Sequence, residues 1–591
     1  MGKTLFYNAD VYSVGLDGRT RRESAVLIDG EKIAAVGSFG PEDIPKLFED
    51  VKECPGTGEE IFLRDLKGAA LLSGFADTHL HVSSTAEMVL DQSLYYLYEP
   101  GIDTRETLIK KYTDRVKTFA ASHPDVPVVR AVGWDPAMFA ELEGGAPTAA
   151  DLDAAVSDRP AMLTSYDHHS IWVNTCGLKT AGITKDTPDP RNGRIERDKN
   201  GDPTGIIREF TAIDYFKSRV PGADYTIEEY KRGILAYQEQ YGLPFGTMLV
   251  FDALTSKSAA VAFKELAQEG KLKMRVRACY VADPAQDPFQ FDRMIEEKGK
   301  YDVGDLFKIQ TIKFFVDGSG LSFFLEKPFE KAYLDDVGLP EDYLGYAQWE
   351  EDELKEAFLK LNDAGYQIHV HCMGAGAVER TLNAFEYAAK EGKVTGSRHV
   401  IAHVMNIQEK DLERMARLNV IAAMQPMWPV VDDLTQISCY MMGEERALDA
   451  YPLGKLHRAG VRITCGTDFP VTIPPSPFLG MASGMTRKMG NGSGRGEQFE
   501  EKVLAPKDDP DVNKVSADVL AAGYTSNGAY QLFLEDTTGT LAGGMSADFV
   551  ILDGPFPEDE PETIRHMYVK EAYFKGEKVY AAPEKRCGQV I

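Results

Sequence analysis

The chain has 591 residues, of which 43% are hydrophobic and 27% charged, with a net charge of −27. This composition is that of a globular protein and excludes general disorder, and the length suits about two to four domains. Because acidic residues outnumber basic residues by 92 to 65, the chain repels phosphate groups, and we expect neither nucleic acid nor an anionic membrane as a partner.

The sequence also bears on location. No stretch approaches the roughly 20 apolar residues of a membrane-spanning helix, and the first residues contain no apolar signal core. The seven cysteines are scattered, without a CxxC pair, which favours reduced thiols over a disulfide framework. We therefore expect a soluble, cytoplasmic protein.

Both ends of the chain are rich in short strand-like runs. Near the start, Asp29-Gly30 separates two apolar runs, which is a good hairpin signal. Near the other end, 547–552 is another short strand-like run. Because chain termini often lie close together in space, we predict one small β-sandwich domain built from 1–68 and 537–591.

The middle of the chain alternates strand-like and helix-like segments. Helical patterns at 351–364 and 375–391 place apolar residues on one face and end at a glycine. Such alternation predicts an α/β fold of parallel βα units, and eight such units close a TIM (β/α)8 barrel. We assign 69–94 and 236–536 to this barrel. The predicted strands are 69–75, 246–254, 273–282, 307–317, 366–373, 398–404, 419–425 and 462–470.

The segment 95–235 fits no simple βα step. It mixes helical patterns with Pro- and Gly-rich turns, and it is too long to be a connecting loop. TIM-barrel enzymes carry their substrate specificity in the loops at the mouth of the barrel. We therefore predict an inserted subdomain that covers the active-site mouth.

Residues that bind metals stand on separate predicted strands. His79 and His81 are two positions apart on an extended chain, so both imidazoles face the same way, as two ligands of one metal require. Lys313 lies inside an apolar run, where an unpaired charge costs several kcal/mol. Each residue alone has an ordinary structural alternative, such as a core histidine, but together at strand ends they indicate a metal site. The candidates are His79, His81, Lys313, His371, His403 and Asp468.

The order of these motifs resembles the metal-dependent amidohydrolase superfamily, in the amidohydrolase family 3 subgroup of N-substituted formamide deformylase-like proteins. The run at 73–81 is similar to the family's opening "PGF-D-HxH" signature, and 466–470 is similar to its "GSDxP" element. Further elements in the subgroup's order are found at 133–136, 151–153, 169–174, 202–205, 312–319, 524–527 and 543–548.

The resemblance implies a two-metal hydrolase. It assigns one metal to His79, His81 and Asp468 and a second metal to His371 and His403. Two zinc ions suit this mixture of ligands, with Mn or Fe as alternatives. A metal-bound water would then attack the substrate, and Asp468 would take its proton and pass it to the leaving nitrogen.

Four further residues acquire roles from the resemblance. Lys313 is implied to be carboxylated, so that the two oxygens of its carbamate bridge the metals, which would also explain a lysine in an apolar strand. Trp134, His169 and Asp317 are candidate substrate contacts, although core packing is the default for an aromatic residue such as Trp134. A structural role for His169 stays open.

Two positions depart from the family pattern. Ala375 follows Gly374 where the family usually has Asp, and Ala402 precedes the strand-six histidine where the family often has Glu. Neither position is a metal ligand. The substitutions imply a less negative pocket, which favours a neutral or anionic substrate over a cationic amine.

The leading hypothesis is a hydrolase of an amide or N-formyl C–N bond in a small molecule, with Asp468 as general base. The same metal barrel also serves for decarboxylation, deamination or ester hydrolysis, because a fold does not fix its chemistry. A non-catalytic regulator with a degenerate site is a third hypothesis, against which the complete ligand set argues. A homodimer is left open.

Overall fold

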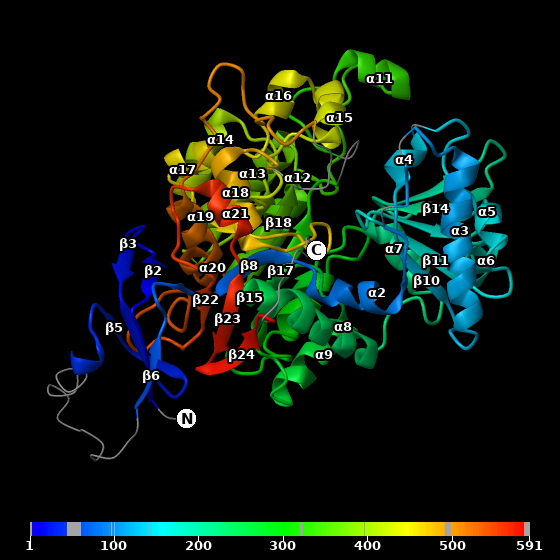
Figure 1. The fold of residues 1–591 in the computed structure, drawn as a ribbon. Helices are drawn as coiled ribbons and strands as arrows, with labels where there is room; N and C mark the ends of the chain where they lie inside the picture. The colour runs from blue at the N-terminus through cyan, green and yellow to red at the C-terminus, as the bar shows by residue number, and fades with distance from the viewer. Residues whose placement is uncertain are drawn as a thin grey trace.

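The fold is taken from a computed structural model, which contains four β-sheets with helices between them (Figure 1). The largest sheet has eight strands, and the other three have four, six and six. The residues that the structure describes are 3–43, 61–95, 97–99, 101–140, 142–318, 323–394, 396–490 and 498–583.

The eight-stranded sheet forms the barrel, and its strands are parallel and follow one another in chain order. At the mouth, the amide of Asp468 donates to the carbonyl of His79 and that of His81 to Phe469, both at 2.7 Å. These bonds join the two edges of the sheet, so the predicted α/β barrel is confirmed. The strands are β8 (Phe75–Leu80), β15 (Thr247–Asp252), β16 (Arg275–Val281), β17 (Phe307–Phe315), β18 (Gln367–Cys372), β19 (Val400–His403), β20 (Ile421–Met424) and β21 (Ile463–Cys465).

Helices separate most of the barrel strands in the sequence. The two helices predicted from periodicity are confirmed as α12 (Glu351–Asp363) and α13 (Ala375–Glu391). The other helices of this part of the chain are α8 (Ile227–Tyr237), α9 (Lys257–Gln268), α10 (Gln290–Glu296), α11 (Lys331–Val337), α14 (Glu409–Arg417), α15 (Asp433–Met442), α16 (Glu444–Leu448), α17 (Leu453–Arg458), α18 (Pro477–Thr486), α19 (Ala517–Tyr524) and α20 (Ser526–Gln531).

The first barrel strand was predicted wrongly at 69–75. Ala70–Ser73 (β7) belongs to a different sheet, where it pairs with β2 (Asp10–Val14), and the barrel begins only after Gly74. A Cβ at Gly74 would stand 2.8 Å from the sulfur of Met248, so the chain passes between the two sheets where a side chain has no room. Because buried residues continue on both sides of this glycine, the apolar pattern does not separate the strands.

Two sheets are built from the ends of the chain, drawn in dark blue and red (Figure 1). The four-stranded sheet has N-terminal strands alone, and the other combines strands of both ends. Their strands are β1 (Lys3–Tyr7), β2, β3 (Thr20–Glu23), β4 (Ala25–Asp29), β5 (Lys32–Gly37), β6 (Ile61–Asp65), β7, β22 (Phe549–Leu552), β23 (Val569–Phe574) and β24 (Glu577–Ala581). One sheet has the order β5-β4-β1-β6 and the other β24-β23-β22-β7-β2-β3. The strands β4 and β5 form the hairpin predicted at Asp29-Gly30. One apolar cluster contains residues of both sheets, including Phe6 and Phe549 with ring centroids 5.1 Å apart, so the sheets share a core.

A buried ion pair joins these terminal sheets to the barrel. The guanidinium of Arg275, in β16, contacts the carboxylate of Asp548 and donates to Ser546 Oγ at 3.0 Å. Asp305 accepts from Arg275 Nε at 2.8 Å. Since Arg275 and Asp548 are both buried, each neutralises a charge that would be costly alone.

The insertion between β8 and β15 forms a six-stranded sheet of its own, shown in cyan beside the barrel (Figure 1). Alternate residues of its strands enter two apolar clusters, as Leu163 and Met162 do, so the sheet is buried on both faces. The division of the whole chain into three domains stays a prediction. The elements are α2 (Thr85–Leu90), β9 (Gln92–Ser93), α3 (Arg105–Ser122), β10 (Val129–Trp134), α4 (Pro136–Ala140), α5 (Ala149–Asp153), β11 (Ala161–Ser165), β12 (Ser170–Val173), α6 (Thr175–Ala181), β13 (Arg194–Arg197), β14 (Pro203–Arg208) and α7 (Phe210–Lys217).

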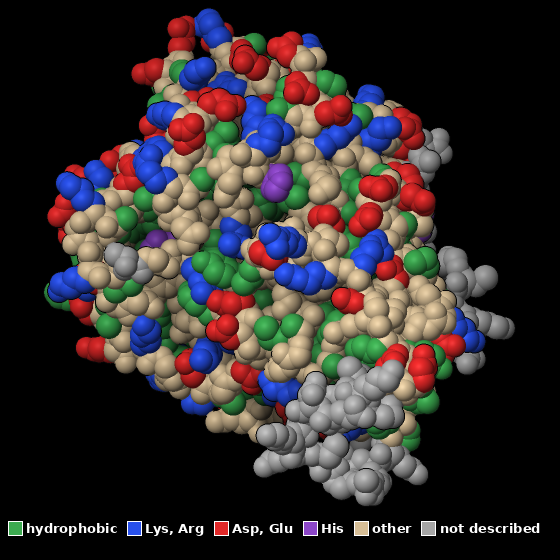
Figure 2. All heavy atoms as spheres, turned by 90° about the vertical axis from the view of Figure 1, so that its left-hand side faces the viewer, with side chains coloured by type: hydrophobic (Ala, Val, Ile, Leu, Met, Phe, Trp, Pro, Cys, Tyr) green, Lys and Arg blue, Asp and Glu red, His purple; other side chains and the backbone are tan. Residues whose placement is uncertain are grey.

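The surface carries charges of both signs. On the face drawn in Figure 2, acidic and basic side chains are interspersed. None of the helices in the described ranges combines the length and the apolar content that crossing a bilayer requires.

Candidate functional site

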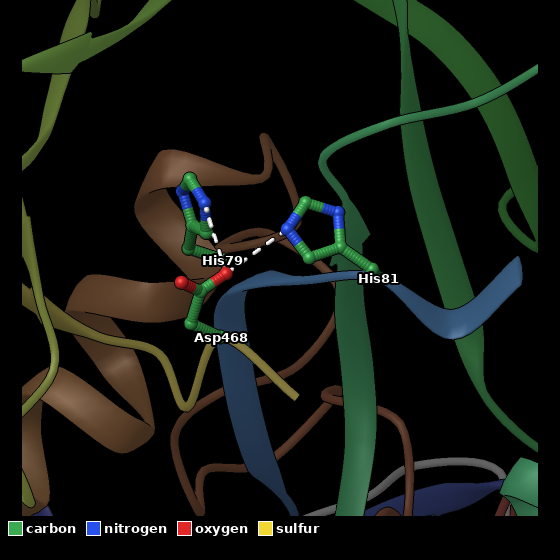
Figure 3. Close-up of side chains that lie close together, drawn as sticks. All are labelled: His79, His81 and Asp468. Carbon is green, nitrogen blue, oxygen red and sulfur yellow. Dashed lines mark ion pairs between the residues drawn. The ribbon is translucent and has the colours of Figure 1, made fainter. Parts of the chain in front are cut away.

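Two histidines and an aspartate meet at the seam of the barrel (Figure 3). His79 lies near the end of β8, His81 follows that strand, and Asp468 follows β21. Asp468 Oδ1 is 3.0 Å from His81 Nε2 and 3.5 Å from His79 Nε2. All three ligand atoms lie within 4.8 Å of one another, a spacing that suits two nitrogens and one oxygen around a single metal.

The backbone is strained at two of the predicted metal ligands. Asp468 has a φ of 57° and His403 a φ of 75°, in a region that costs non-glycine residues about 1–3 kcal/mol. At Asp468, the backbone bond to the carbonyl of His79 holds this conformation. Such strain persists only where surrounding contacts impose it, and it is typical of functional sites.

The carboxylate of Asp77 joins the segment that carries His79 to the segment that carries Asp468. Asp77, in β8, accepts from the amide of Thr467 at 3.0 Å and from its hydroxyl at 2.5 Å. Burial raises the pKa of Asp77 to about 7 although these bonds oppose the rise. The residue before Asp468 is thereby fixed to the strand that carries His79.

Lys313 is completely buried in β17. Its Nζ lies 3.5 Å from His79 Nε2 and 4.8 Å from the centre of the Phe315 ring. Burial lowers the pKa of Lys313 to about 8. The neutral amine is therefore far more populated than for a lysine in water.

His371 and His403 each have one ring nitrogen held by a neighbour. His371 Nδ1 donates to Asp317 Oδ1 at 3.1 Å, and His403 Nδ1 donates to Gln425 Oε1 at 2.9 Å. These bonds leave Nε2 of both rings as the nitrogen available to a metal. Burial lowers the pKa of His403 to about 3 and that of His371 well below its usual value, so both rings are in the neutral form that binds metals. Trp428 stacks on His403 with 5.3 Å between ring centroids.

The six predicted ligands form one connected cluster. The ring of His403 is 4.7 Å from that of His79 and 4.6 Å from that of His371, measured between centroids. His369, also in β18, shares a hydrogen bond of 2.8 Å with His79 Nδ1. Within the described part of the chain, one group has three ligand atoms close enough for a single ion, namely His79, His81 and Asp468.

The polar atoms of this group fit a metal ion. Asp468 Oδ1 is buried and has no hydrogen bond of good geometry among the described residues. A buried carboxylate oxygen without a donor is costly, and here two imidazole nitrogens face it. A divalent cation satisfies the oxygen and both nitrogens at once.

His169 reaches this cluster from the insertion. Its Nδ1 donates to Glu209 Oε2 at 3.0 Å, and its ring centroid lies 6.3 Å from that of His371. Burial alone lowers the pKa of His169, but Glu209 outweighs this and raises it to about 9. Beside them, Phe210 of the insertion packs on Phe315 of the barrel with ring centroids 4.7 Å apart.

The other two predicted substrate contacts, Trp134 and Asp317, are buried. Trp134 is completely buried in the insertion, where its Nε1 donates to the carbonyl of Leu163 at 2.9 Å. Asp317 is also completely buried, and its carboxylate accepts from the amides of Met373 and Gly374 besides His371. The contacts of Asp317 orient His371, a predicted metal ligand. A substrate contact by Trp134 or Asp317 stays a prediction.

The positions that depart from the family pattern are both buried. Ala375 is the first residue of α13, and Ala402 packs with Ala423 in a small apolar cluster. Gln425 and Glu209, which hold His403 and His169, were not predicted. Nothing in their spacing marks them, because each acts through a contact distant in sequence.

The chain matches known proteins along most of its length. The sequence model of a family described as "Amidohydrolase family" matches residues 63–580. An N-substituted formamide deformylase of Arthrobacter pascens is 22% identical over 588 residues, which cover 98% of both chains. The exoenzymes regulatory protein AepA of Pectobacterium carotovorum is 28% identical over 78% of this chain and 93% of its own. The crystal structure of an uncharacterized metal-dependent hydrolase from Pyrococcus horikoshii superimposes with a TM-score of 0.68 at 22% identity, covering 98% of this chain and 100% of that one.

Proposed function

The chain belongs to the amidohydrolase family, and from this premise we propose that it hydrolyses the C–N bond of an amide or N-formyl group in a small molecule. Family membership supports a hydrolase, and the formamide deformylase among its relatives supports this kind of bond. The observation that carries the proposal is the meeting of His79, His81 and Asp468 around a carboxylate oxygen without a hydrogen-bond donor.

The proposed metals are two zinc ions, with Mn or Fe as alternatives. His79, His81 and Asp468 would hold one ion, and His371 and His403 the other, because each offers a neutral ring nitrogen or a carboxylate oxygen. When bound, zinc supplies a water of pKa about 7 and polarises the scissile carbonyl.

Lys313 is proposed to be carboxylated. Carbon dioxide adds only to a neutral amine, and the lowered pKa of Lys313 makes that form available. The addition forms one N–C bond and releases one proton, and it leaves an anion with two oxygens. Such an anion is compatible with burial beside metal-binding histidines, whereas an unpaired ammonium is not.

Asp468 is proposed to be the general base. Burial raises the pKa of its carboxyl, but the contact with His81 lowers it by more, so the pKa remains below its usual range. The ionised carboxylate can therefore take a proton from the attacking water at neutral pH. The water oxygen bonds to the carbonyl carbon, the C–N bond breaks, and the amine leaves after gaining one proton.

A substrate screen tests this proposal. Purified protein loaded with zinc is assayed against N-substituted formamides, N-acyl amines, aryl esters and aryl carboxylic acids, with the amine, ammonia and carbon dioxide products measured separately. We expect release of an amine, and its loss in Asp468→Ala but not in the exposed control Asp352→Asn. Release of ammonia or carbon dioxide instead would identify deamination or decarboxylation.

A regulatory role without catalysis is the second candidate, because one relative is named a regulatory protein. The complete set of ligand residues argues against it. Protein that contains metal in stoichiometric amounts but hydrolyses no compound of the screen would favour this alternative.

A further inference from the structure

The insertion is attached to the barrel at two places that differ in burial. The chain enters and leaves it beside α2 and α8, where a Cβ at Gly233 of α8 would stand 2.4 Å from the amide nitrogen of Ala86 in α2. Next to these helices, Arg130 of β10 pairs with Asp91 at 3.1 Å and with Glu229 at 2.6 Å. The side chains of Arg130 and Asp91 are only 12% and 2% exposed. We call this place the hinge, because it is closely packed and contains both connections of the chain.

The second attachment consists of polar contacts made by Arg191 and Asn192, which lie between α6 and β13. Arg191 donates two bonds to the carboxylate of Glu353 in α12, at 2.9 and 2.5 Å. Asn192 donates to the carbonyl of Gln348 and accepts from the hydroxyl of Tyr346. The side chains of Arg191 and Glu353 are 43% and 40% exposed, and exposed ion pairs contribute little stability. We call these contacts the latch, because they can break while the hinge stays intact.

The latch packs against the helix of the insertion that reaches the barrel mouth. A Cβ at Gly193, the residue that follows the latch, would stand 2.7 Å from the amide nitrogen of Ala212 in α7. This helix begins with Phe210, whose ring packs on Phe315 of β17 with centroids 4.7 Å apart. Phe315 lies in turn 5.5 Å from His371, measured between ring centroids. Release of the latch therefore removes the support of the helix that closes this part of the mouth.

The latch is also connected to the strand that carries His371. Gln348, which accepts from Asn192, donates its own amide to the carbonyl of Val316 at 2.8 Å. The amide of Val316 donates in turn to the carbonyl of His371 at 3.2 Å. Closure of the latch therefore fixes the backbone at the mouth end of β18, beside a predicted metal ligand.

The predicted metal ligands are shielded from solvent while the latch is closed. Five of the six are buried, and even His371 and Asp468, which lie at the mouth, are each only 7% exposed. Enzymes that enclose their site in this way admit substrate by moving a loop or a domain. Because the hinge is buried and the latch is exposed, the movement that breaks the fewest buried contacts is release of the latch.

We propose that the insertion is a gate, which turns at the hinge and admits the small-molecule substrate to the metal-binding cluster when the latch is released. The proposal rests on the proposed function, because it places the reaction at this cluster. Closure of the latch returns Phe210 to Phe315 and encloses the substrate, and a second release lets the products leave. The rate of the reaction therefore depends on an ion pair, Arg191 with Glu353, that includes no predicted metal ligand.

The test locks the latch in its closed state. The double variant Arg191→Cys, Glu353→Cys replaces the ion pair by two thiols, and 1,2-ethanediyl bismethanethiosulfonate links them through two disulfides that a reductant breaks. We expect the linked, zinc-loaded protein to lose nearly all release of amine from N-substituted formamides and to regain it on reduction. The reduced double variant is the reference, and each single variant, treated in the same way, is the control for reaction at the native cysteines.

Unchanged activity of the linked protein would overturn the proposal, because substrate would then enter while the latch is closed. An equal loss in both single variants would overturn it as well, since that loss requires no link between the insertion and the barrel.

The release of zinc to a chelator is a second readout, which needs no substrate. The linked protein should release zinc more slowly than the reduced protein. Glu353→Gln should release it about 1.5–5-fold faster than the wild type, the factor by which an exposed ion pair shifts an equilibrium. Glutamine can still accept from the amide of Glu350 at the start of α12, as Glu353 does at 3.1 Å. Asp352→Asn is the matched control, because Asp352 is the exposed neighbour of Glu353.

Equal rates of zinc release in the linked and the reduced protein would refute the gate. If the wild-type protein releases no amine from any formamide, the proposed function fails, and the rates of zinc release still decide whether the insertion acts as a gate.

Discussion

Replacing Asp317 by asparagine tests how strongly the second proposed metal position depends on a residue that never touches the metal. The Asp317 carboxylate accepts from His371 Nδ1 at 3.1 Å, from Met373 N at 2.9 Å, from Gly374 N at 2.8 Å and from Phe324 N at 3.2 Å. All four are donors, so the amide group of an asparagine has no orientation that satisfies them.

The free-energy cost of the substitution depends on the orientation of the asparagine side-chain amide. If its oxygen keeps His371, the amides of Gly374 and Phe324 lose their acceptor, at about 1–3 kcal/mol for each unsatisfied donor. If its oxygen turns to these amides, His371 loses the bond that fixes its tautomer. Loss of such a partner lowers metal affinity by about 10–100-fold, equivalent to about 1.4–2.7 kcal/mol.

The assay is a zinc titration in competition with a chelator, with Asp352→Asn as the control on an exposed carboxylate. We expect one of two zinc equivalents to bind about 10–100-fold more weakly. Burial raises the pKa of Asp317 to about 7 although the backbone amides oppose the rise, so below that pH the wild-type carboxyl becomes neutral like asparagine. The difference between the two proteins should therefore shrink as the pH falls through about 7. Equal affinity of both proteins at pH 8 would refute the reasoning.

Three further predictions concern neighbouring residues. The double variant His79→Ala, His371→Ala should contain no stoichiometric metal by elemental analysis, and unchanged metal content would contradict the site assignment. Lys313→Ala should lose activity and regain part of it with added formate or acetate, because a free carboxylate replaces the carbamate; absence of rescue, with metal still bound, would favour a single-metal site. Glu209→Gln should lower the pKa of His169, because Glu209 raises that pKa to about 9 against the effect of burial; an imidazole titration, followed by NMR, that is identical to that of the wild type would contradict this.

Much of the barrel could be predicted from sequence because apolar residues recur with one period in strands and with another in helices. The strands from β15 to β21 were predicted at their observed places, and each predicted ligand lies near the mouth end of its strand. The prediction of the first strand was wrong because apolar residues stand on both sides of Ser73-Gly74, and only three-dimensional pairing assigns β7 to one sheet and β8 to another.

The supporting residues of the site were harder to predict. Gln425 and Glu209 each hold an imidazole, yet they lie 22 and 40 positions from His403 and His169 along the chain. Neither interaction follows from periodicity. Glu209 also has a strained backbone, with a φ of 65° and a ψ of 154°, and the amino-acid sequence does not reveal these angles for a residue other than glycine or proline.

The pairing of β7 also constrains how the protein is made. In its sheet, β7 lies between β2, which precedes it in the sequence, and β22, which begins only at Phe549. A growing chain on the ribosome therefore presents one edge of β7 unpaired while the insertion and the whole barrel are synthesised. Unpaired strand edges invite association with other chains. Truncation before Phe549 leaves this edge permanently open, so that such fragments are expected to aggregate even where the barrel sequence is complete.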